Sequence, residues 1–256
     1  MRELEKDGVA FISGRWPLDP ARNTLVFIHG AGGSSVLWRA QVESLAERVN
    51  TVALDLPGHG ASKGPGRDRV PDYARVVLEF LDAIGAPGPI PCGLSMGGAI
   101  AQQLLLDHVR RFPAGILVST GARLKVMPLI LETIRSNYPE YVNSFRAFAA
   151  SARTPPERLQ ALLEDAARCD PQVAYGDFLA CDAFDVADRL PGIGVPVLVV
   201  TASDDKLTPP KYGAFLAGAI RTAEPAHIED AGHVVPAEKP EELHRAVLGF
   251  LDRHGL

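Results

Sequence analysis

The sequence predicts an α/β fold in which helices cover both faces of a doubly wound, mostly parallel sheet. From residue 23 to residue 120, short continuously apolar segments alternate with segments whose apolar residues recur at helical spacing. Such apolar segments are typical of strands buried on both faces, and the alternation predicts right-handed crossovers between parallel strands. The alternation stops between residues 122 and 190 and then resumes. A helical segment is therefore expected to interrupt the sheet.

The first half of the chain supplies most of the expected sheet. One or two edge strands are expected within residues 8–16. Buried strands are expected at 23–29, 49–54, 86–92 and 113–120. Helices with one apolar face are expected over residues 36–46, 70–84 and 97–109. Ser34 or Ser35 can cap the first of these helices.

The segment from 122 to 190, called the helical insertion below, shows no strand pattern. Its amphipathic segments are 126–136, 138–150, 156–169 and 171–181. Strands are expected again at 195–201 and 223–229, and helices at 209–219 and 238–254. Because the insertion leaves and re-enters the carboxyl edge of the sheet, where open α/β sheets bind ligands, we expect it to form a lid. Residues 1–121 and 191–256 then form the core, and 122–190 form a helical cap inserted before the seventh strand.

Composition and charge exclude several classes of partner. The chain has 256 residues, of which 46% are hydrophobic and 22% charged, as in an ordinary soluble domain. A net charge of -5 without a basic cluster argues against nucleic acid and anionic membranes. No signal peptide or spanning segment is expected. Three cysteines without metal-site spacing, Cys92, Cys169 and Cys181, indicate reduced thiols and a cytoplasmic location. A monomer or homodimer is expected.

The stretch Gly93-Leu94-Ser95-Met96-Gly97 lies between a short apolar strand and a helix. A serine at such a corner has a strained backbone, and glycines two positions away let neighbouring backbone pass without a Cβ clash. The turn exposes the serine oxygen. It also leaves the amide of Met96 at a helix N-terminus, where it can stabilise an oxyanion. Ser95 is therefore the candidate nucleophile.

A serine nucleophile needs a base, and the base needs an orienting carboxylate. Asp204 and Asp205 follow the strand at 195–201, and His233 follows the strand at 223–229. The carboxyl ends of parallel strands meet at one edge of a sheet, so each of the three residues lies on a loop at that edge. Along the chain they follow the order serine, acid, histidine. Cys92 precedes the turn in a buried strand, which favours a packing role.

Five motifs in order resemble the α/β-hydrolase fold family over essentially the whole chain: His29-Gly30-Ala31-Gly32-Gly33, Asp55-Leu56-Pro57-Gly58-His59-Gly60, Gly93-Leu94-Ser95-Met96-Gly97-Gly98, Ser203-Asp204-Asp205-Lys206-Leu207-Thr208-Pro209 and Gly232-His233. In similar proteins the acid strand ends in Gly-x-x-Asp with a proline four residues later. Here Ala202 takes the position of the glycine, which places Asp205 at the acid and Pro209 at the proline, so Asp205 is favoured over Asp204. Substitution of that glycine is the one departure from the pattern.

The resemblance implies a triad of Ser95, Asp205 and His233. It also implies an oxyanion hole formed by the amides of Met96 and Ala31. Substrate contacts are expected from Gly30, Trp38, Leu94 and Val234. No metal and no organic cofactor are expected, because a buried serine triad needs neither.

The resemblance favours a serine hydrolase that cleaves small-molecule carboxylic esters with small to medium apolar acyl groups. Enol-lactonases of aromatic degradation, perhydrolase or haloperoxidase-like enzymes and carbon–carbon hydrolases share the scaffold and stay open as alternatives. A lactone that bears carboxylates requires an arginine in the pocket, for which Arg123, Arg135 and Arg146 are candidates. Two further alternatives are a non-catalytic receptor and a cyanohydrin lyase.

Overall fold

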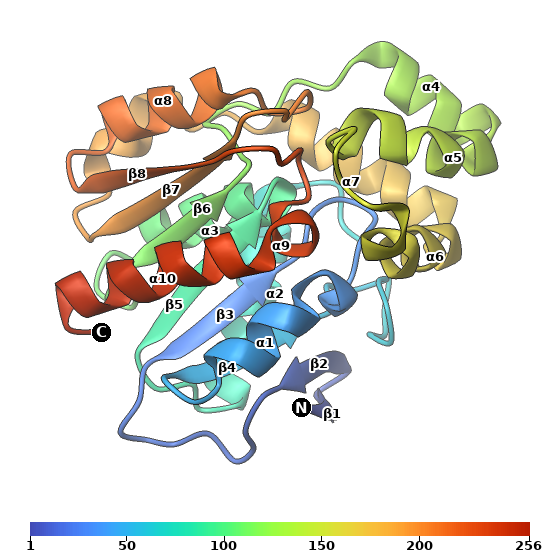
Figure 1. Cartoon of the computed structure of the whole chain (residues 1–256). Coiled ribbons are helices and arrows are strands. Elements are labelled where there is room, and N and C mark those ends of the chain that lie inside the picture. Colours follow the sequence, from blue (N-terminus) through green and yellow to red (C-terminus); the bar gives the residue numbers. More distant parts are fainter.

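The computed structural model describes residues 1–256 and confirms the predicted doubly wound α/β architecture (Figure 1). Its strands are β1 (Arg2–Lys6), β2 (Val9–Ser13), β3 (Thr24–Ile28), β4 (Asn50–Leu54), β5 (Pro89–Leu94), β6 (Gly115–Val118), β7 (Val197–Ala202) and β8 (Ala223–Ile228). All eight belong to one sheet with the order β1-β2-β4-β3-β5-β6-β7-β8. Strands β3 to β8 run parallel to one another, and the β1–β2 and β2–β4 pairs are antiparallel.

The edge strand β1 is absent from the elements that the sequence predicts. It pairs with β2 in a register that runs from Arg2 opposite Ser13 to Lys6 opposite Val9. Four of its five residues are exposed and carry charge, so the segment has no alternation of apolar and polar residues to reveal it. Charged side chains on an edge strand also hinder pairing with another chain.

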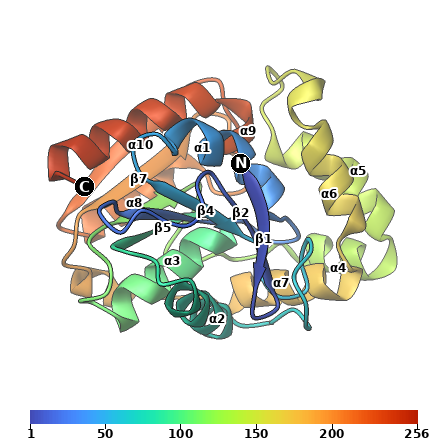
Figure 2. The same cartoon turned by 90° about the horizontal axis from the view of Figure 1, so that it is seen from below.

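Helices cover the sheet on both faces, as Figures 1 and 2 show. On one face lie α1 (Arg39–Leu45) and α10 (Pro240–His254), and on the other lie α2 (Val70–Ala83), α3 (Met96–Asp107) and α8 (Pro210–Ala219). Successive residues of β3 point to opposite faces, so Leu25 packs on the α1 side and Val26 on the α3 side. This two-sided burial is the reason why the central strands are continuously apolar.

Outside the helical insertion, two departures from the predicted helices occur near the ends of elements. The helix expected over residues 36–46 is a 3-10 turn, Ser35–Trp38, followed by α1, and Ser34 caps that turn by accepting a hydrogen bond from the amide of Val36 (3.2 Å). A short helix, α9 (Val235–Glu238), precedes α10. It begins directly after the loop that carries His233.

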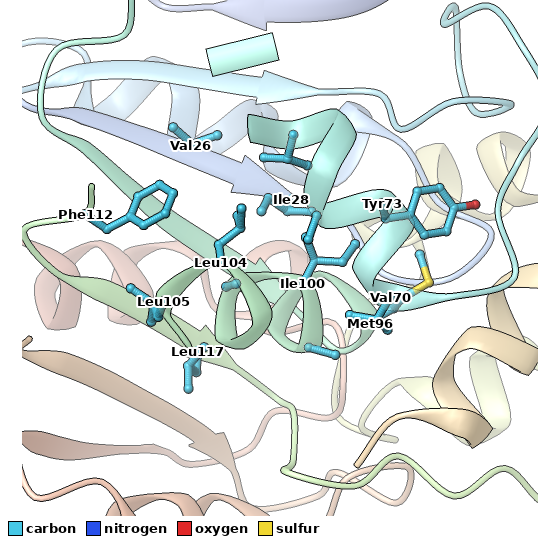
Figure 3. Close-up of a cluster of buried hydrophobic side chains, with 14 of the residues drawn as sticks. Val26, Ile28, Val70, Tyr73, Met96, Ile100, Leu104, Leu105, Phe112 and Leu117 are labelled. Atoms are coloured by element: carbon cyan, nitrogen blue, oxygen red, sulfur yellow. The ribbon is translucent and has the colours of Figure 1, made fainter. Parts of the chain in front are cut away.

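Helix α3 is the most buried helix of the structure, and its packing fixes the position of Ser95. Figure 3 shows side chains of α3 against side chains of β3 and α2: Met96, Ile100 and Leu104 lie among Val26, Ile28, Val70 and Tyr73. Full burial of each apolar side chain contributes about 1.5–3 kcal/mol. Because both faces of the helix start are packed, the turn before it has little freedom to move.

The helical insertion lies between β6 and β7 and contains α4 (Pro128–Ser136), α5 (Tyr138–Ala149), α6 (Gln160–Arg168) and α7 (Pro171–Ala183), with 3-10 turns at Pro156–Arg158 and Ala187–Gly192. These helices gather beyond one end of the sheet, at the right of Figure 1. The two ends of the insertion are joined by an ion pair between Arg123 and Asp185 (2.7 Å). None of the helices combines the length and apolarity that crossing a lipid bilayer requires.

Candidate active site

Ser95 occupies the turn between β5 and α3 in a strained conformation. Its φ of 56° and ψ of -116° lie in a region that residues with a side chain rarely adopt. The amide of Ser95 donates to the carbonyl of Val118 in the neighbouring strand (3.1 Å), and the hydroxyl of Thr120 donates to the carbonyl of Ser95 (2.8 Å). The surrounding backbone therefore imposes this conformation on the serine.

The two glycines of the motif are required by close backbone approach. A Cβ atom on Gly93 would lie 1.9 Å from the carbonyl oxygen of Gly97, and one on Gly97 would lie 2.2 Å from the carbonyl oxygen of Ile28. Neither neighbour is a flexible side chain, so no other residue fits without moving the backbone. This explains the Gly-x-Ser-x-Gly pattern in terms of contacts.

The loop after β3 lies against Ser95. A Cβ atom on Gly30 would come within 3.3 Å of the Cβ of Ser95. Gly30 and Ala31 border the same cavity as Ser95. The amide of Met96 is the first of α3, so it has no partner within the helix. These two backbone segments can therefore present amides to an oxygen bound near Ser95.

A buried histidine holds this loop. The amide of Leu56 donates to Nε2 of His29 (3.0 Å), so the proton of a neutral ring is on Nδ1, which donates to the carbonyl of Gly30 (2.8 Å). Burial and the nearby His59 together lower the pKa of His29 to about 3. The ring is thus neutral at physiological pH and braces the loop as a hydrogen-bonding group.

Asp177 of α7 ties the helical insertion to the same loop. Its carboxylate accepts hydrogen bonds from the amide of Gly32 (2.8 Å), the hydroxyl of Tyr73 (2.6 Å) and Nε2 of His59 (2.8 Å). Burial by itself lowers the pKa of His59, but the charge and hydrogen bond of Asp177 outweigh burial and raise it. No local pattern in the sequence marks Asp177, because its partners are 104 to 145 residues away.

His233 and Asp205 are in contact at the carboxyl edge of the sheet. Nδ1 of His233 lies 3.1 Å and 3.0 Å from the two carboxylate oxygens of Asp205. The amides of Leu207 and Thr208 and the hydroxyl of Thr208 also donate to this carboxylate. Burial by itself raises the pKa of Asp205, but the attraction of His233 and the hydrogen bonds from Thr208 lower it below its ordinary value. Asp205 is therefore a fixed acceptor for the Nδ1 proton of His233.

Asp204 has a different environment. Its carboxylate accepts hydrogen bonds from the hydroxyls of Ser151 (2.5 Å) and Ser203 (3.1 Å), and the residue is half-buried. These bonds lower the pKa of Asp204. Of the two adjacent aspartates, Asp205 is thus the one that contacts the imidazole.

Glu238 is a second buried carboxylate that the sequence analysis does not identify. It accepts hydrogen bonds from the amides of Gly232 (3.0 Å) and Val234 (3.1 Å), the residues on either side of His233. It also accepts from the amide of Ser151 (2.8 Å) and the hydroxyl of Thr154 (2.6 Å). The loop that carries the histidine and the end of α5 are therefore held by one side chain.

We expect Glu238→Gln to lower the free energy of unfolding by about 1–3 kcal/mol, because an amide nitrogen then replaces one of two acceptor oxygens and leaves a buried donor unpaired. Urea unfolding monitored by circular dichroism measures the change. The exposed Glu241 is the matched control, and Glu241→Gln should change stability by less than about 0.5 kcal/mol. Equal unfolding midpoints for the two variants would contradict the role assigned to Glu238.

A cavity of about 150 Å³ joins Ser95 to His233. Its wall is mostly apolar and comes from the loop after β3, the α4 and α5 helices, α6, α7 and the loops after β7 and β8. Four of the residues predicted at the site, Gly30, Ala31, Leu94 and Val234, border this cavity. Asp165 is the one carboxylate in the wall, and its Oδ2 accepts a hydrogen bond from the hydroxyl of Ser34 (2.6 Å).

Trp38 does not border the cavity, contrary to the prediction that it contacts substrate. Its indole is fully buried and stacks on Phe27, with ring centroids 4.9 Å apart. Helical spacing shows which side of a helix faces inward, but not whether that side faces the core or a pocket. Here it faces the core between α1 and the sheet.

None of the three arginines considered for the pocket borders the cavity either. Arg123 pairs with Asp185, Arg135 lies over the ring of Tyr175 (5.6 Å to the centroid), and Arg146 is exposed. Within the cavity wall there is no lysine or arginine at all. Cys92 is fully buried, and burial raises the pKa of its thiol.

The fold and this arrangement define a hydrolase of the α/β class, with a strained serine after the fifth strand and a histidine–aspartate pair after the last two. The comparison with protein families agrees. A model of the alpha/beta hydrolase family matches residues 25–246. The chain therefore belongs to the alpha/beta hydrolase family.

Known members of the family that resemble the chain differ in the reactions for which they are named. A protein of Azorhizobium caulinodans, provisionally named carbamate hydrolase RutD, is 30% identical over 86% of this chain and 88% of its own. The 3-oxoadipate enol-lactonase 2 of Acinetobacter baylyi is 27% identical, with 91% and 90% covered. The solved structure of a thermophilic esterase is 31% identical with a TM-score of 0.84, and the match covers 99% of this chain and 98% of that one. These names agree on hydrolysis and differ in substrate.

Proposed function

We propose that the protein is a serine hydrolase of uncharged carboxylic esters and that it acts through Ser95, His233 and Asp205. The observation that carries the proposal is the shared cavity: Ser95 and His233 both border it, and Asp205 holds His233 from behind. A serine on a strained turn, a histidine and a buried carboxylate in this arrangement suit acyl transfer.

In the proposed reaction, Oγ of Ser95 attacks the ester carbonyl carbon while Nε2 of His233 accepts the hydroxyl proton. The Nδ1 proton of His233 points to Asp205, which stabilises the imidazolium. Collapse of the tetrahedral intermediate breaks the bond to the alkoxy group, which takes the proton from His233 and leaves as the alcohol. Water then attacks the acyl-enzyme by the same steps and releases the carboxylic acid and Ser95.

The amides of Met96 and Ala31 are proposed to bind the oxyanion. Hydrogen bonds that are fixed before the reaction stabilise developing charge without the cost of reorienting solvent. The bracing of the Gly30–Gly32 segment by His29 and Asp177 supports this role, because it limits motion of the loop amides. The helical insertion, residues 122–190, is proposed to serve as the cap, since α4 to α7 supply much of the apolar wall.

The charge of the cavity favours neutral esters over the carboxylate-bearing lactones among the alternatives. A buried carboxylate on a substrate needs a cationic partner, and the wall offers none. The one charged group of the wall outside the proposed triad is Asp165, which would repel an anion. Burial raises the pKa of Asp165, although the hydrogen bond from Ser34 opposes this. The relative named as an enol-lactonase therefore indicates the scaffold and not the substrate of this chain.

Two methyl esters of the same diacid, adipic acid, test the selection for uncharged substrates at pH 8. We expect dimethyl adipate to be hydrolysed with a kcat/KM at least about tenfold above that of monomethyl adipate, because the free carboxylate of the latter meets an apolar wall and Asp165. Asp165→Asn should narrow this difference. Comparable rates on the two esters in the wild type, or faster hydrolysis of the acid, would contradict selection for uncharged substrates.

A further inference from the structure

Most of the large apolar side chains that the protein exposes gather at the mouth of the cavity. Seven such residues are exposed in the whole chain: Met1, Val109, Met127, Leu129, Phe148, Leu207 and Phe215. Four of the seven, called the apolar rim below, also border the cavity: Met127 (54% exposed), Leu129 (61%), Phe148 (45%) and Leu207 (36%). Isolated exposed apolar residues need no explanation, but four that border one cavity do.

The apolar rim joins the helical insertion to the core. Met127 and Leu129 lie at the start of α4, Phe148 lies near the end of α5, and Leu207 lies in the loop that carries Asp205. The amide of Leu207 donates to the Asp205 carboxylate (2.9 Å). The apolar surface therefore begins beside the proposed catalytic acid and continues outward onto the insertion.

The cavity is partly open to solvent, and its volume is limited. A cavity of about 150 Å³ is the size that holds a ligand like benzene. We therefore expect the far end of an acyl chain much longer than about six carbons to reach the open side of the cavity. The part beyond the mouth meets either water or the apolar rim.

We propose that the apolar rim binds the distal part of a long acyl chain, so that the enzyme prefers esters of medium to long fatty acids over short ones. This inference rests on the proposed function, since it extends the acyl side of the same site. The occupant is the substrate chain because all four rim residues border the same cavity as Ser95 and His233. Binding there removes apolar surface from water on both partners.

The test compares p-nitrophenyl butyrate with p-nitrophenyl decanoate, below the concentration at which the decanoate forms micelles. Each methylene that the protein buries fully is expected to raise kcat/KM by roughly fourfold. The variant Met127→Gln/Leu129→Gln replaces two apolar rim side chains by polar ones of similar size. It should lower the decanoate-to-butyrate ratio of kcat/KM by about tenfold, the equivalent of roughly two methylenes.

Val109 (56% exposed) and Phe215 (53%) provide the matched control, because they are equally exposed but do not border the cavity. Val109→Gln/Phe215→Gln should leave the decanoate-to-butyrate ratio as in the wild type. A ratio that falls equally in both double variants, or a wild type that prefers butyrate, would overturn the role of the rim.

Binding to the Ser95→Ala variant separates this inference from the proposed function. We expect 2-decanone to bind more tightly than 2-hexanone in isothermal titration calorimetry, and Met127→Gln/Leu129→Gln to abolish most of that difference. This outcome supports binding of the acyl chain by the apolar rim even if the wild type hydrolyses neither ester. Absence of hydrolysis would count against the proposed reaction and not against the rim. Equal affinity for the two ketones would overturn the inference even if short esters are hydrolysed.

Discussion

Replacement of Ser95 by alanine is expected to lower kcat for ester hydrolysis by about 10⁴-fold or more, to near the background rate. Alanine lacks the oxygen that attacks the ester. The other serine and threonine hydroxyls of the cavity wall donate to groups other than His233: Ser34 to Asp165, Thr133 to the carbonyl of Leu129 and Ser144 to the carbonyl of Tyr141. The fold should persist. The strained turn is held by backbone bonds and by Thr120, and none of these involves the serine hydroxyl.

The measurement is hydrolysis of p-nitrophenyl butyrate beside labelling by a fluorophosphonate, which reacts with activated serines. Ser119 is a suitable control, because it is also a serine with positive φ (45°), follows the next strand and does not border the cavity. Its hydroxyl is buried without a partner, so Ser119→Ala should cost little. Substantial turnover or labelling in Ser95→Ala would show that the nucleophile has been assigned to the wrong residue.

Asp205→Asn is expected to lower kcat by about 10⁴-fold. An asparagine amide can donate to Nδ1 of His233, and the proton of the neutral ring is then on Nε2. Nε2 must lack a proton in order to accept the one from Ser95. The loss should appear in kcat more than in KM, because Asp205 lies behind His233 and does not border the cavity. The carboxylate also organises its own loop through Thr208, so circular dichroism and thermal unfolding must accompany the kinetics.

Asp204→Asn is the matched control, since it makes the same chemical change one residue away. Its carboxylate contacts Ser151 and Ser203 and not the imidazole, so kcat should stay within a few-fold of the wild type. Loss of activity in Asp204→Asn with near-normal turnover in Asp205→Asn would reverse the assignment of the acid.

Local patterns in the sequence predict most of the strands and the mostly parallel character of the sheet. The central strands are buried on both faces, so each is a continuous apolar segment, and the helices between them carry one apolar face. β1 escapes this reasoning because its single apolar residue, Leu4, stands among four charged ones, and one residue forms no periodic pattern. Trp38 shows a different limit. The sequence indicates that it lies on the apolar side of a helix, but not that this side packs on Phe27.

The candidate nucleophile, base and acid are predictable because the chemistry requires a serine between glycines, an aspartate and a histidine at the ends of particular strands. What holds them in place is not predictable from such short segments. Glu238 supports the histidine loop together with Ser151, and Asp177 supports the loop at Gly32 from α7. In each case a single buried carboxylate joins segments far apart in the chain, and nothing near that residue marks it.

The sequence by itself thus determines the doubly wound sheet and a serine, an aspartate and a histidine at its carboxyl edge, because periodicity and turn chemistry are local properties. Only the tertiary structure decides that Asp205 and not Asp204 contacts His233, that the cavity has no cationic group, and that the exposed apolar side chains of α4 and α5 surround its mouth. Those features depend on which surfaces come into contact when the helical insertion packs over the sheet edge, and a local sequence pattern does not specify these contacts.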